Sequence, residues 1–512
     1  MWRSDHGAIP WILIVLVGPL MDTGRMSAQA ANFDGILSLT TVDELTGQAL
    51  PVRMELRNRR GRPIKIKAEN VVSRDDYIVF DGQVDLELRQ GAYEFTIEAG
   101  PEYQTRLGHF TIEKHAQDAK QIVLRRQVQM SDEGWWAGDL DVKLPPGDVA
   151  LLTAAARIEF APLTVVSNTR GKCWQNKGFE KNQKRLASYL GPLAALDHGR
   201  GGGLLYFGTA LPTDVCQRQA DESSLQMLNR AVTAKCEAIA LTPFAWDLPL
   251  WIASEKLTAI QVIHRHALVD GVADNEDWGR PRDEIYFPGK LGNGRYSEVV
   301  YHHVLNCGLR IPPAAGSGAG FNKNPVGANR VYVHCGEQYS PQEWIAGLRA
   351  GRVIVTNGPL LRTSVSGSPP GHVFRLREAE SREFQIALQL TFYQRSPVEY
   401  LEIVKNGRVQ YEIRLDELVR RRGVLPPVEF DESGWFLVRA VTDNTQTYQF
   451  ASTGPYYVEA NSGPRISRAS VRYFLDWLDD AATEFADQPE VVSDIEAARP
   501  FWDRLLAMAN AD

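Results

Sequence analysis

The sequence predicts a multi-domain protein of mixed α/β plus β class, and three features of the chain indicate it. Its 512 residues are too many for a single hydrophobic core. Apolar residues alternate with period two before about residue 128 and after about residue 358, which is typical of antiparallel strands. Between these stretches, short apolar runs alternate with helical segments, which indicates an α/β unit.

Composition and net charge argue against one class of partner, nucleic acid. Hydrophobic residues make up 44% of the chain and charged residues 23%, close to the average of globular proteins. The net charge of -7 gives none of the basic surface that a phosphate backbone attracts. We therefore expect no nucleic-acid partner.

The first 30 residues resemble a signal peptide. Arg3 precedes an apolar run from about Ile9 to Met21, and Ala28-Gln29-Ala30 forms an A-x-A cleavage pattern. We expect cleavage near Ala30 and export to the periplasm or the exterior, with retention as an uncleaved anchor as the alternative. No other segment has the length of apolar sequence that a membrane span requires, so we expect no other membrane contact.

The five cysteines suit an oxidising compartment only in part, because an odd count leaves at least one thiol free. None forms a CxxC pair, which argues against a structural zinc site. The sequence predicts one disulfide, between Cys173 and Cys216.

Residues 31–128 are expected to form an antiparallel β-sandwich. In "QVDLELRQGAYEFTI", Val84, Leu86 and Leu88 share one face, Gln90-Gly91 interrupts the pattern, and alternation then resumes. This pattern predicts a hairpin.

Residues 129–357 are expected to form the α/β unit. The stretch "SPQEWIAGLRAGR" predicts a helix with Ser340 as N-cap, Pro341 at the first helical position, Glu343 completing a capping box, and Gly351 as the stop signal. Strand-like runs flank it on both sides. This alternation favours an α/β arrangement.

Residues 358–465 are expected to form a second antiparallel sandwich, and residues 466–512 a helical tail. Asn406-Gly407 between two alternating runs is a strong hairpin signal. In the tail, helical spacing of apolar residues predicts one helix, and a second is expected after Pro500, both packing on the body. The apolar positions of the first helix are Val471, Phe474, Leu475 and Leu478.

The stretch "EGWWAGDLDVKLPPGD" has the frame of a metal-binding strand. A strand ending in Asp-x-His-x-His aims two imidazoles at one face, where they can bind a divalent metal. In this frame the chain resembles the CehA/McbA-type metallohydrolases of the PHP (polymerase and histidinol phosphatase) superfamily, particularly exported bacterial members. The matching residues are Trp135, Trp136, Gly138, Asp139, Leu140 and Val142.

The resemblance continues through "GGGLLYFG", "PFAWDLPLWIA" and "GLRAGRVIVTNGPLLR" and covers most of the chain. It implies a distorted (βα) PHP-like barrel, flanked by the two sandwiches, with a metal centre at the carboxyl ends of its strands. The two histidine positions of the motif are, however, occupied by Asp141 and Lys143. A lysine ammonium repels a dication, so only Asp141 remains a plausible ligand there.

A second family motif, the SDxH turn, falls at "GSGAG", where this chain has Ser317, Gly318, Ala319 and Gly320. These side chains do not ligate zinc as histidine or carboxylate does. Both metal motifs are therefore lost.

Several residues remain as substitutes. His264 and His266 alternate in "QVIHRH" and share a face, as ligands or as a hydrogen-bonded pair. His198 precedes a glycine run, which is typical either of a loop that approaches a ligand or of an ordinary loop that leads into a strand. Asp247 stands among large aromatics, as an acid–base group of raised pKa or as a helix cap. His303 lies on an apolar helical face, which favours a core role.

Two functions follow. In the first, the chain is a catalytically inactive or strongly altered scaffold that binds a small molecule or a glycan. In the second, it is a metal-dependent ester or phosphoester hydrolase with zinc or a similar divalent metal at a rearranged centre. That hydrolase would use Asp247 and Lys143 in catalysis and draw its ligands from Asp139, Asp141, His198, His264 and His266.

Overall fold

The structure is a computed structural model. It describes residues 33–512 except 67, 69, 75, 177–191, 209–210, 212, 220–221, 378, 392–395 and 461–462. The predicted signal peptide, residues 1–30, lies outside the described residues. Within the described ranges, no helix combines the length and the apolar character that crossing a bilayer requires.

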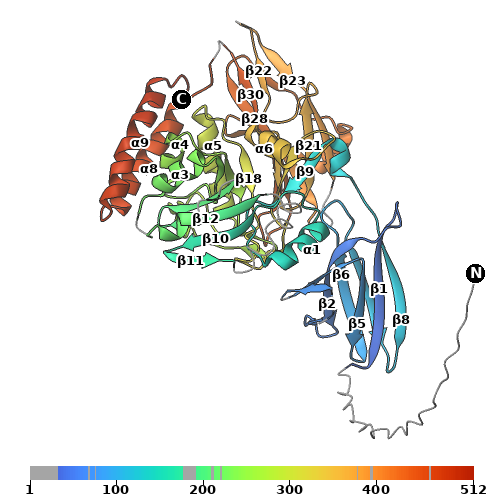
Figure 1. Cartoon of the computed structure of the whole chain (residues 1–512). Coiled ribbons are helices and arrows are strands. Elements are labelled where there is room, and N and C mark those ends of the chain that lie inside the picture. Colours follow the sequence, from blue (N-terminus) through green and yellow to red (C-terminus); the bar gives the residue numbers. More distant parts are fainter. Residues whose placement is uncertain are drawn as a thin grey trace, which may run out of the picture.

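The N-terminal part is a pair of β-sheets set to one side of the body (Figure 1). One sheet has the order β5-β1-β8, with bounds Gln83–Leu88, Gly35–Asp43 and Gln117–Leu124. The other has the order β3-β4-β2-β6-β7, with bounds Val71–Ser73, Ile78–Asp81, Pro51–Asn58, Gly91–Glu98 and Arg106–Ile112. Side chains from both sheets, among them Leu39, Val52, Leu86 and Ile97, form one buried cluster.

The hairpin predicted around Gln90-Gly91 is wrong in its pairing, although both strands exist. β5 pairs with β1, whereas β6 pairs with β2 and β7 in the opposite sheet. The turn is therefore a crossing between sheets. Crossing lets the apolar faces of both strands point into the same core, which an isolated two-stranded ribbon cannot achieve.

The central part is built on a seven-stranded sheet of order β11-β10-β12-β13-β14-β15-β18. In that order the strands are Lys172–Gln175, Leu163–Thr169, Leu193–Gly199, Gly202–Gly208, Cys236–Ala240, Ala259–Ile263 and Pro313–Ala315. β13 runs antiparallel to both neighbours, and the pairs β10–β12, β14–β15 and β15–β18 are parallel. The sheet is therefore mixed.

Residues 139–143, called here the closing segment, join the two sides of this sheet. On one side the backbone N–H of Leu140 donates to the carbonyl of Ala315, the last residue of β18 (3.1 Å). On the other, the N–H of Thr164 on β10 donates to the carbonyl of Val142 (2.9 Å). These bonds close the strands from β10 to β18 into a ring, with the closing segment as its last member.

Helices and short connections surround the ring. The helices are α1 (Pro146–Ala156), α3 (Ser224–Thr233), α4 (Leu248–Ala253), α5 (Gly292–Asn306) and α6 (Pro341–Arg349). The 3₁₀ turns are η1 (Met130–Glu133) and η2 (Thr213–Gln217), and β16 (Ala267–Leu268) pairs with β17 (Gly271–Val272).

A nine-stranded sheet connects the central part to the C-terminal β region. Its order is β22-β30-β28-β29-β20-β19-β9; in addition, β25 pairs with β28, and β26 pairs with β25. Because β20 pairs with β29, this sheet runs across the domain boundary predicted at residue 357. The strands in that order are Val373–Arg375, Tyr456–Glu459, Gly434–Thr442, Phe450–Thr453, Val353–Thr356, Arg330–His334, Trp135–Gly138, Val398–Lys405 and Arg408–Arg414.

Shorter elements complete the C-terminal β region. β21 (Leu360–Val365) pairs with β24 (Ile386–Thr391), β23 (Arg382–Phe384) pairs with β27 (Val428–Phe430), and α7 spans Leu415–Arg420. The predicted β-rich character of this region is confirmed.

Two local sequence signals are confirmed in detail. β25 and β26 form a two-residue hairpin, with Asn406 (φ 51°) and Gly407 (φ 81°) in the left-handed region that this turn needs. In α6, the hydroxyl of Ser340 accepts the N–H of Glu343 (3.1 Å), and Gly351 (φ 71°) follows the helix. Capping and turn residues act over a few positions, which is why the sequence reveals them.

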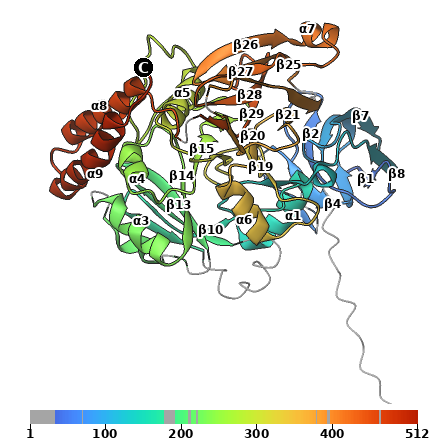
Figure 2. The same ribbon diagram turned by 90° about the horizontal axis from the view of Figure 1, so that it is seen from above.

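The tail forms α8 (Arg468–Glu484) and α9 (Pro489–Ala507), which lie side by side against the part of the ring that carries α3 and α4 (Figure 2). The predicted start of the last helix after Pro500 is wrong, since α9 begins at Pro489 and contains Pro500. Burial of one apolar face offsets the backbone hydrogen bond that the proline removes. Trp502 on that face donates its indole N–H to the Pro249 carbonyl (3.2 Å), so the tail packs on the body as predicted.

Candidate functional site

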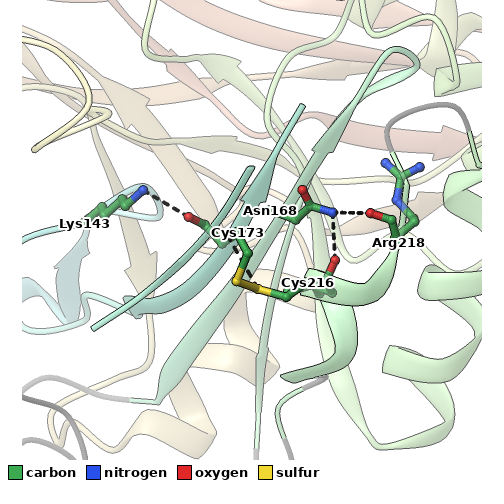
Figure 3. The surroundings of a disulfide bond; sticks show 7 residues. Lys143, Asn168, Cys173, Cys216 and Arg218 are labelled. Carbon is green, nitrogen blue, oxygen red and sulfur yellow. Dashed lines mark hydrogen bonds between the residues drawn. A yellow bond between two sulfur atoms is a disulfide. The ribbon is translucent and has the colours of Figure 1, made fainter. Parts of the chain in front are cut away.

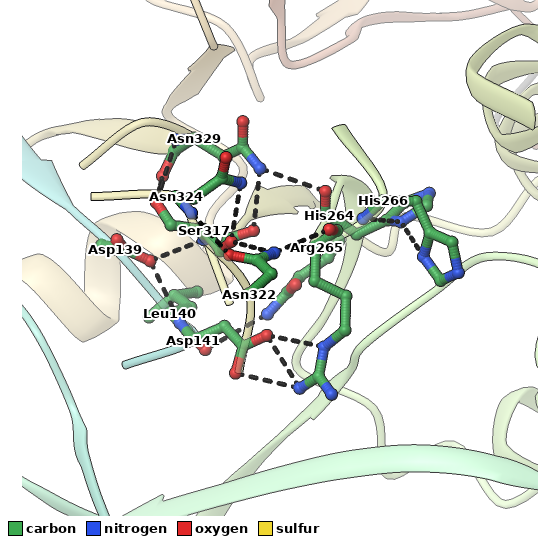
Figure 4. A network of polar contacts seen from close by, with 12 residues as sticks. Asp139, Leu140, Asp141, His264, Arg265, His266, Ser317, Asn322, Asn324 and Asn329 are labelled. Atoms are coloured by element: carbon green, nitrogen blue, oxygen red, sulfur yellow. Dashed lines mark hydrogen bonds and ion pairs between the residues drawn. The ribbon is translucent and has the colours of Figure 1, made fainter. Parts of the chain in front are cut away.

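Asp139 fastens the closing segment to the loop after β18. Its carboxylate accepts the backbone N–H groups of Asp141 (3.2 Å), Ser317 (2.9 Å) and Gly327 (2.8 Å) (Figure 4). The residue has no exposed surface, and burial raises the pKa of its carboxyl to about 6. Both carboxylate oxygens thus serve the backbone.

Asp141 is bound by a guanidinium. Arg265 donates from Nε and Nη2 to the two carboxylate oxygens, at 2.9 and 3.0 Å (Figure 4). Burial raises the pKa of Asp141, and the charge of Arg265 opposes that rise. A fork-shaped pair of this kind is strong and directional. The carboxylate of Asp141 is therefore already neutralised by the guanidinium of Arg265.

The glycines of "GSGAG" have a steric role. Gly320 has φ +88°, and a Cβ there would lie 1.9 Å from the carbonyl oxygen of Lys143. A Cβ on Gly316 would lie 2.6 Å from the Cβ of Asp141. The glycines of this turn therefore let the closing segment lie directly against it.

Three asparagines that were not predicted from the sequence also fix the loop after β18. Asn329 donates to the carbonyls of His264 (3.0 Å) and Gly316 (3.1 Å), and Asn322 and Asn324 both donate to the carbonyl of Ser317 (Figure 4). Their only signal was the asparagine-rich stretch "FNKNPVGAN". They hold the loop after β18 against the chain that follows β15.

His264 and His266 form a contact pair after β15, so they do share one side of the chain. Their Nδ1 atoms lie 3.1 Å apart, His264 Nε2 lies 2.9 Å from Ser297 Oγ, and His266 Nε2 lies 3.2 Å from Asn275 Oδ1. Burial lowers the pKa of His264 well below its usual value and that of His266 to about 4. Both rings are neutral near pH 7, with every ring nitrogen engaged.

Lys143 lies on the inner side of the ring. Its Nζ donates to Ser167 Oγ on β10 (3.0 Å) and stands over the rings of Trp174 (4.2 Å) and Phe321 (4.8 Å). Burial, and then the charge of Arg265, lower the pKa of Lys143. Among the residues that the structure describes, it has no carboxylate ion-pair partner.

The predicted disulfide is confirmed. Cys173 on β11 bonds to Cys216 in η2 and so ties the neighbour of Trp174 to the body (Figure 3). Cys236, Cys307 and Cys335 are free thiols. The crosslink holds β11 at the edge of β10, beside Lys143.

His198 lies on β12 with its Nδ1 buried and without a hydrogen-bond partner. Burial, together with the charges of Arg265 and Arg170, lowers the pKa of this imidazole to about 3. Thr169, which is its register partner on β10, also has a buried hydroxyl without a partner. Two adjacent polar groups in this place therefore have no partner among the residues that the structure describes.

Asp247 belongs to a different group. It occupies the N-cap position of α4 but makes no capping bond, and it accepts instead from Ser224 Oγ (2.5 Å), which also receives the indole N–H of Trp251. Burial raises the pKa of its carboxyl. The glycine run after His198 contacts this aspartate, since the Asp247 N–H donates to the carbonyl of Gly201 (2.8 Å).

His303 has the structural surroundings expected of a core residue. Its Nδ1 lies 3.0 Å from Ser470 Oγ, and its ring stacks on Tyr473 at 4.1 Å. It links α5 to α8.

The five predicted metal ligands are thus distributed over separate hydrogen-bonded groups. Across the described part of the chain, no set of three or more histidine, cysteine, aspartate or glutamate side chains is arranged to hold a metal ion. Sequence reasoning missed Arg265, which stands between the two histidines of "HRH". Its only signal was a positive charge beside two candidate ligands.

Comparisons with known proteins assign no family. No protein-family profile and no curated protein sequence matches the chain. Among solved structures, the TIE protein of Bacillus anthracis is 19% identical over 23% of this chain and 20% of its own, with a TM-score of 0.15. The chain therefore spans about a fifth of that protein.

A β-glucuronidase of Parabacteroides merdae is 10% identical over 80% of this chain and 60% of its own (TM-score 0.17). β-Glucuronidase 3 of Bacteroides uniformis is 12% identical over 85% and 65% (TM-score 0.17). Scores this low carry no argument about fold or activity.

Proposed function

We propose that this protein is an exported, PHP-like relative of the CehA/McbA metallohydrolases that serves as a binding scaffold and has no metal-dependent hydrolase activity. The observation that carries the proposal is the bidentate bond between Arg265 and Asp141. The carboxylate oxygens of Asp141, which could have bound a metal, accept hydrogen bonds from Arg265 instead.

Charge supports this proposal. A dication beside Asp141 would face the Arg265 guanidinium and the Lys143 ammonium, and like charges repel strongly where water is excluded. Breaking the Arg265–Asp141 pair to admit the ion would also leave a buried guanidinium without its partner, which is costly. The residues present therefore do not fit a divalent metal.

Export is part of the proposal. The Cys173–Cys216 disulfide suits an oxidising compartment, in keeping with the signal peptide expected over residues 1–30.

The alternative is an active ester or phosphoester hydrolase with a divalent metal at a rearranged centre. It is favoured by one observation, the neutral and adjacent imidazoles of His264 and His266. It requires Ser297 and Asn275 to release these rings and Arg265 to leave Asp141.

The deciding experiment is elemental analysis of the full chain purified without added metal, followed by an ester and phosphoester panel with zinc, manganese or magnesium. We expect less than one tenth of an equivalent of any transition metal and no turnover. Stoichiometric metal that disappears in the Asp141→Ala/His266→Ala double variant, together with hydrolysis that it supports, would establish the alternative.

A further inference from the structure

The inner side of the ring carries two cations on one aromatic ring. Lys143 Nζ lies 4.8 Å from the centre of the Phe321 ring, and the guanidinium carbon of Arg265 lies 4.3 Å from it. Asp141 forms an ion pair with Arg265, whereas Lys143 has no carboxylate within ion-pair distance among the described residues, although the charge of Asp141 raises its pKa. The like charge of Arg265 is one of the causes that lower the pKa of Lys143.

Polar groups without partners lie on the same face. Ser167 and Thr169 are two positions apart on β10 and therefore point to one side, and His198 pairs in register with Thr169. The bond from Lys143 to Ser167 shows that this side is the one facing the ammonium. Within the described part of the chain, the buried Thr169 hydroxyl and the His198 Nδ1 both lack a hydrogen-bond partner, and leaving such groups unmatched costs free energy.

The ring of Trp174 forms a flat apolar face on the outer side of these groups. Trp174 is 36% exposed, its ring lies 4.2 Å from Lys143 Nζ, and the neighbouring disulfide holds its strand. Tryptophan presents a large apolar face that stacks on planar or ring-shaped ligands. The Lys143 ammonium, the ring of Trp174 and the Thr169 hydroxyl therefore lie on one side of β10 and β11.

We propose that this place binds the carboxylate of a small ring-containing molecule, with Lys143 as the principal anion contact and Trp174 as the stacking face. The inference rests on the proposed function, since it assigns a ligand to the same metal-free scaffold. A carboxylate would supply Lys143 with a counter-charge that no described residue gives it within ion-pair distance. It also offers acceptors for the remaining ammonium protons and for the Thr169 hydroxyl.

Isothermal titration of the full chain tests this assignment with benzoate and D-glucuronate as probes, and with benzamide and D-glucose as their neutral counterparts. Both carboxylates should bind and both neutral compounds should not. Lys143→Met should weaken binding about tenfold or more, because a charge-assisted hydrogen bond is lost, and Lys143→Arg should retain part of the affinity. Lys120→Met, which removes an exposed ammonium from β8 in the N-terminal sheets, should leave affinity unchanged.

Each outcome of the titrations either supports or overturns the carboxylate assignment. Absence of binding for both carboxylates, or affinities that Lys143→Met does not change in a variant with wild-type thermal stability, would overturn the assignment. Binding of inorganic phosphate in preference to both carboxylates would also overturn it, in favour of a different anion. The metal analysis is independent: a metal-free protein that ignores carboxylates refutes only this inference, whereas a metalated protein refutes the proposed function.

Discussion

Two buried arginine–carboxylate clusters of this molecule have different charge balances. In the ring, Arg265 pairs with Asp141 while Lys143 stays without a carboxylate. At the contact of α5 with the C-terminal β region, Arg439 pairs with both Glu298 (2.8 Å) and Glu402 (2.7 Å).

The second cluster is also closed by a hydroxyl. Tyr448 donates to Glu298 and receives a bond from Arg439 (2.8 Å). The nearby His302 is neutral, since burial lowers its pKa to about 3. The comparison teaches that a buried arginine pairs with carboxylates in both clusters, whereas the ring also holds an ammonium, that of Lys143, with no carboxylate within ion-pair distance among the described residues.

Loss of the guanidinium should have the largest effect in both clusters. Arg439→Met and Arg265→Met should each lower the free energy of unfolding by about 3–5 kcal/mol, because a buried carboxylate loses its partner. Denaturant unfolding of the full chain measures this. Arg421→Met, at an exposed pair with Glu417, is the matched control and should cost less than about 1 kcal/mol.

A second substitution sharpens the difference between the clusters. Adding Asp141→Asn to Arg265→Met should recover most of the lost stability, since it removes the one carboxylate left unpaired. Adding Glu402→Gln to Arg439→Met should recover less, because Glu298 remains buried and charged. Equal recovery in both would contradict the charge balances described above.

Removal of the Cys173–Cys216 disulfide should affect the ring and not the Arg439 cluster. The Cys173→Ser/Cys216→Ser variant should lose about 2–4 kcal/mol of stability through the greater freedom of its unfolded chain. Carboxylate affinity should fall with it, because Trp174 loses its anchor. Cys335→Ser, at a free thiol, is the control; unchanged affinity in the double variant would exclude a positioning role for the crosslink.

The buried histidines give a pH dependence of known sign. The folded-state pKa of His266 is about 4, below the ordinary value near 6.5, so its contribution to stability is present above pH 6.5 and is lost as pH falls toward 4. The stability difference between wild type and His266→Gln should therefore change by about 2 kcal/mol between pH 7 and pH 5, in favour of the variant. His302→Gln should show the same trend in the other cluster, and a pH-independent difference would contradict the burial of the ring.

Chelation should have the smallest effect. Dialysis against EDTA should leave the melting temperature unchanged, because a scaffold without bound metal has no metal-linked stability to lose. Thermal melts before and after dialysis measure this. A fall in melting temperature that added zinc restores would restore the hydrolase alternative.

Local features of the fold were predictable, and long-range ones were not. The Asn406-Gly407 hairpin and the Ser340 cap depend on neighbouring residues, and both were predicted correctly. The pairing of the strands around Gln90-Gly91 was wrong, because alternation reports which face is apolar and not which sheet receives it. The start of α9 was also wrong, since packing of its apolar face against the body outweighs the penalty of Pro500.

By itself, the sequence determined that the chain contains β-rich and α/β parts, that Asp141 and Lys143 stand on either side of Val142, and that Cys173 and Cys216 are candidates for a disulfide. Only the tertiary structure decided what the Asp141 carboxylate binds. Arg265 lies 124 positions from Asp141, and the two meet because the closing segment completes the ring beside β18. Composition and spacing describe which groups are available, but the strand order decides which charges are neutralised and which remain unpaired.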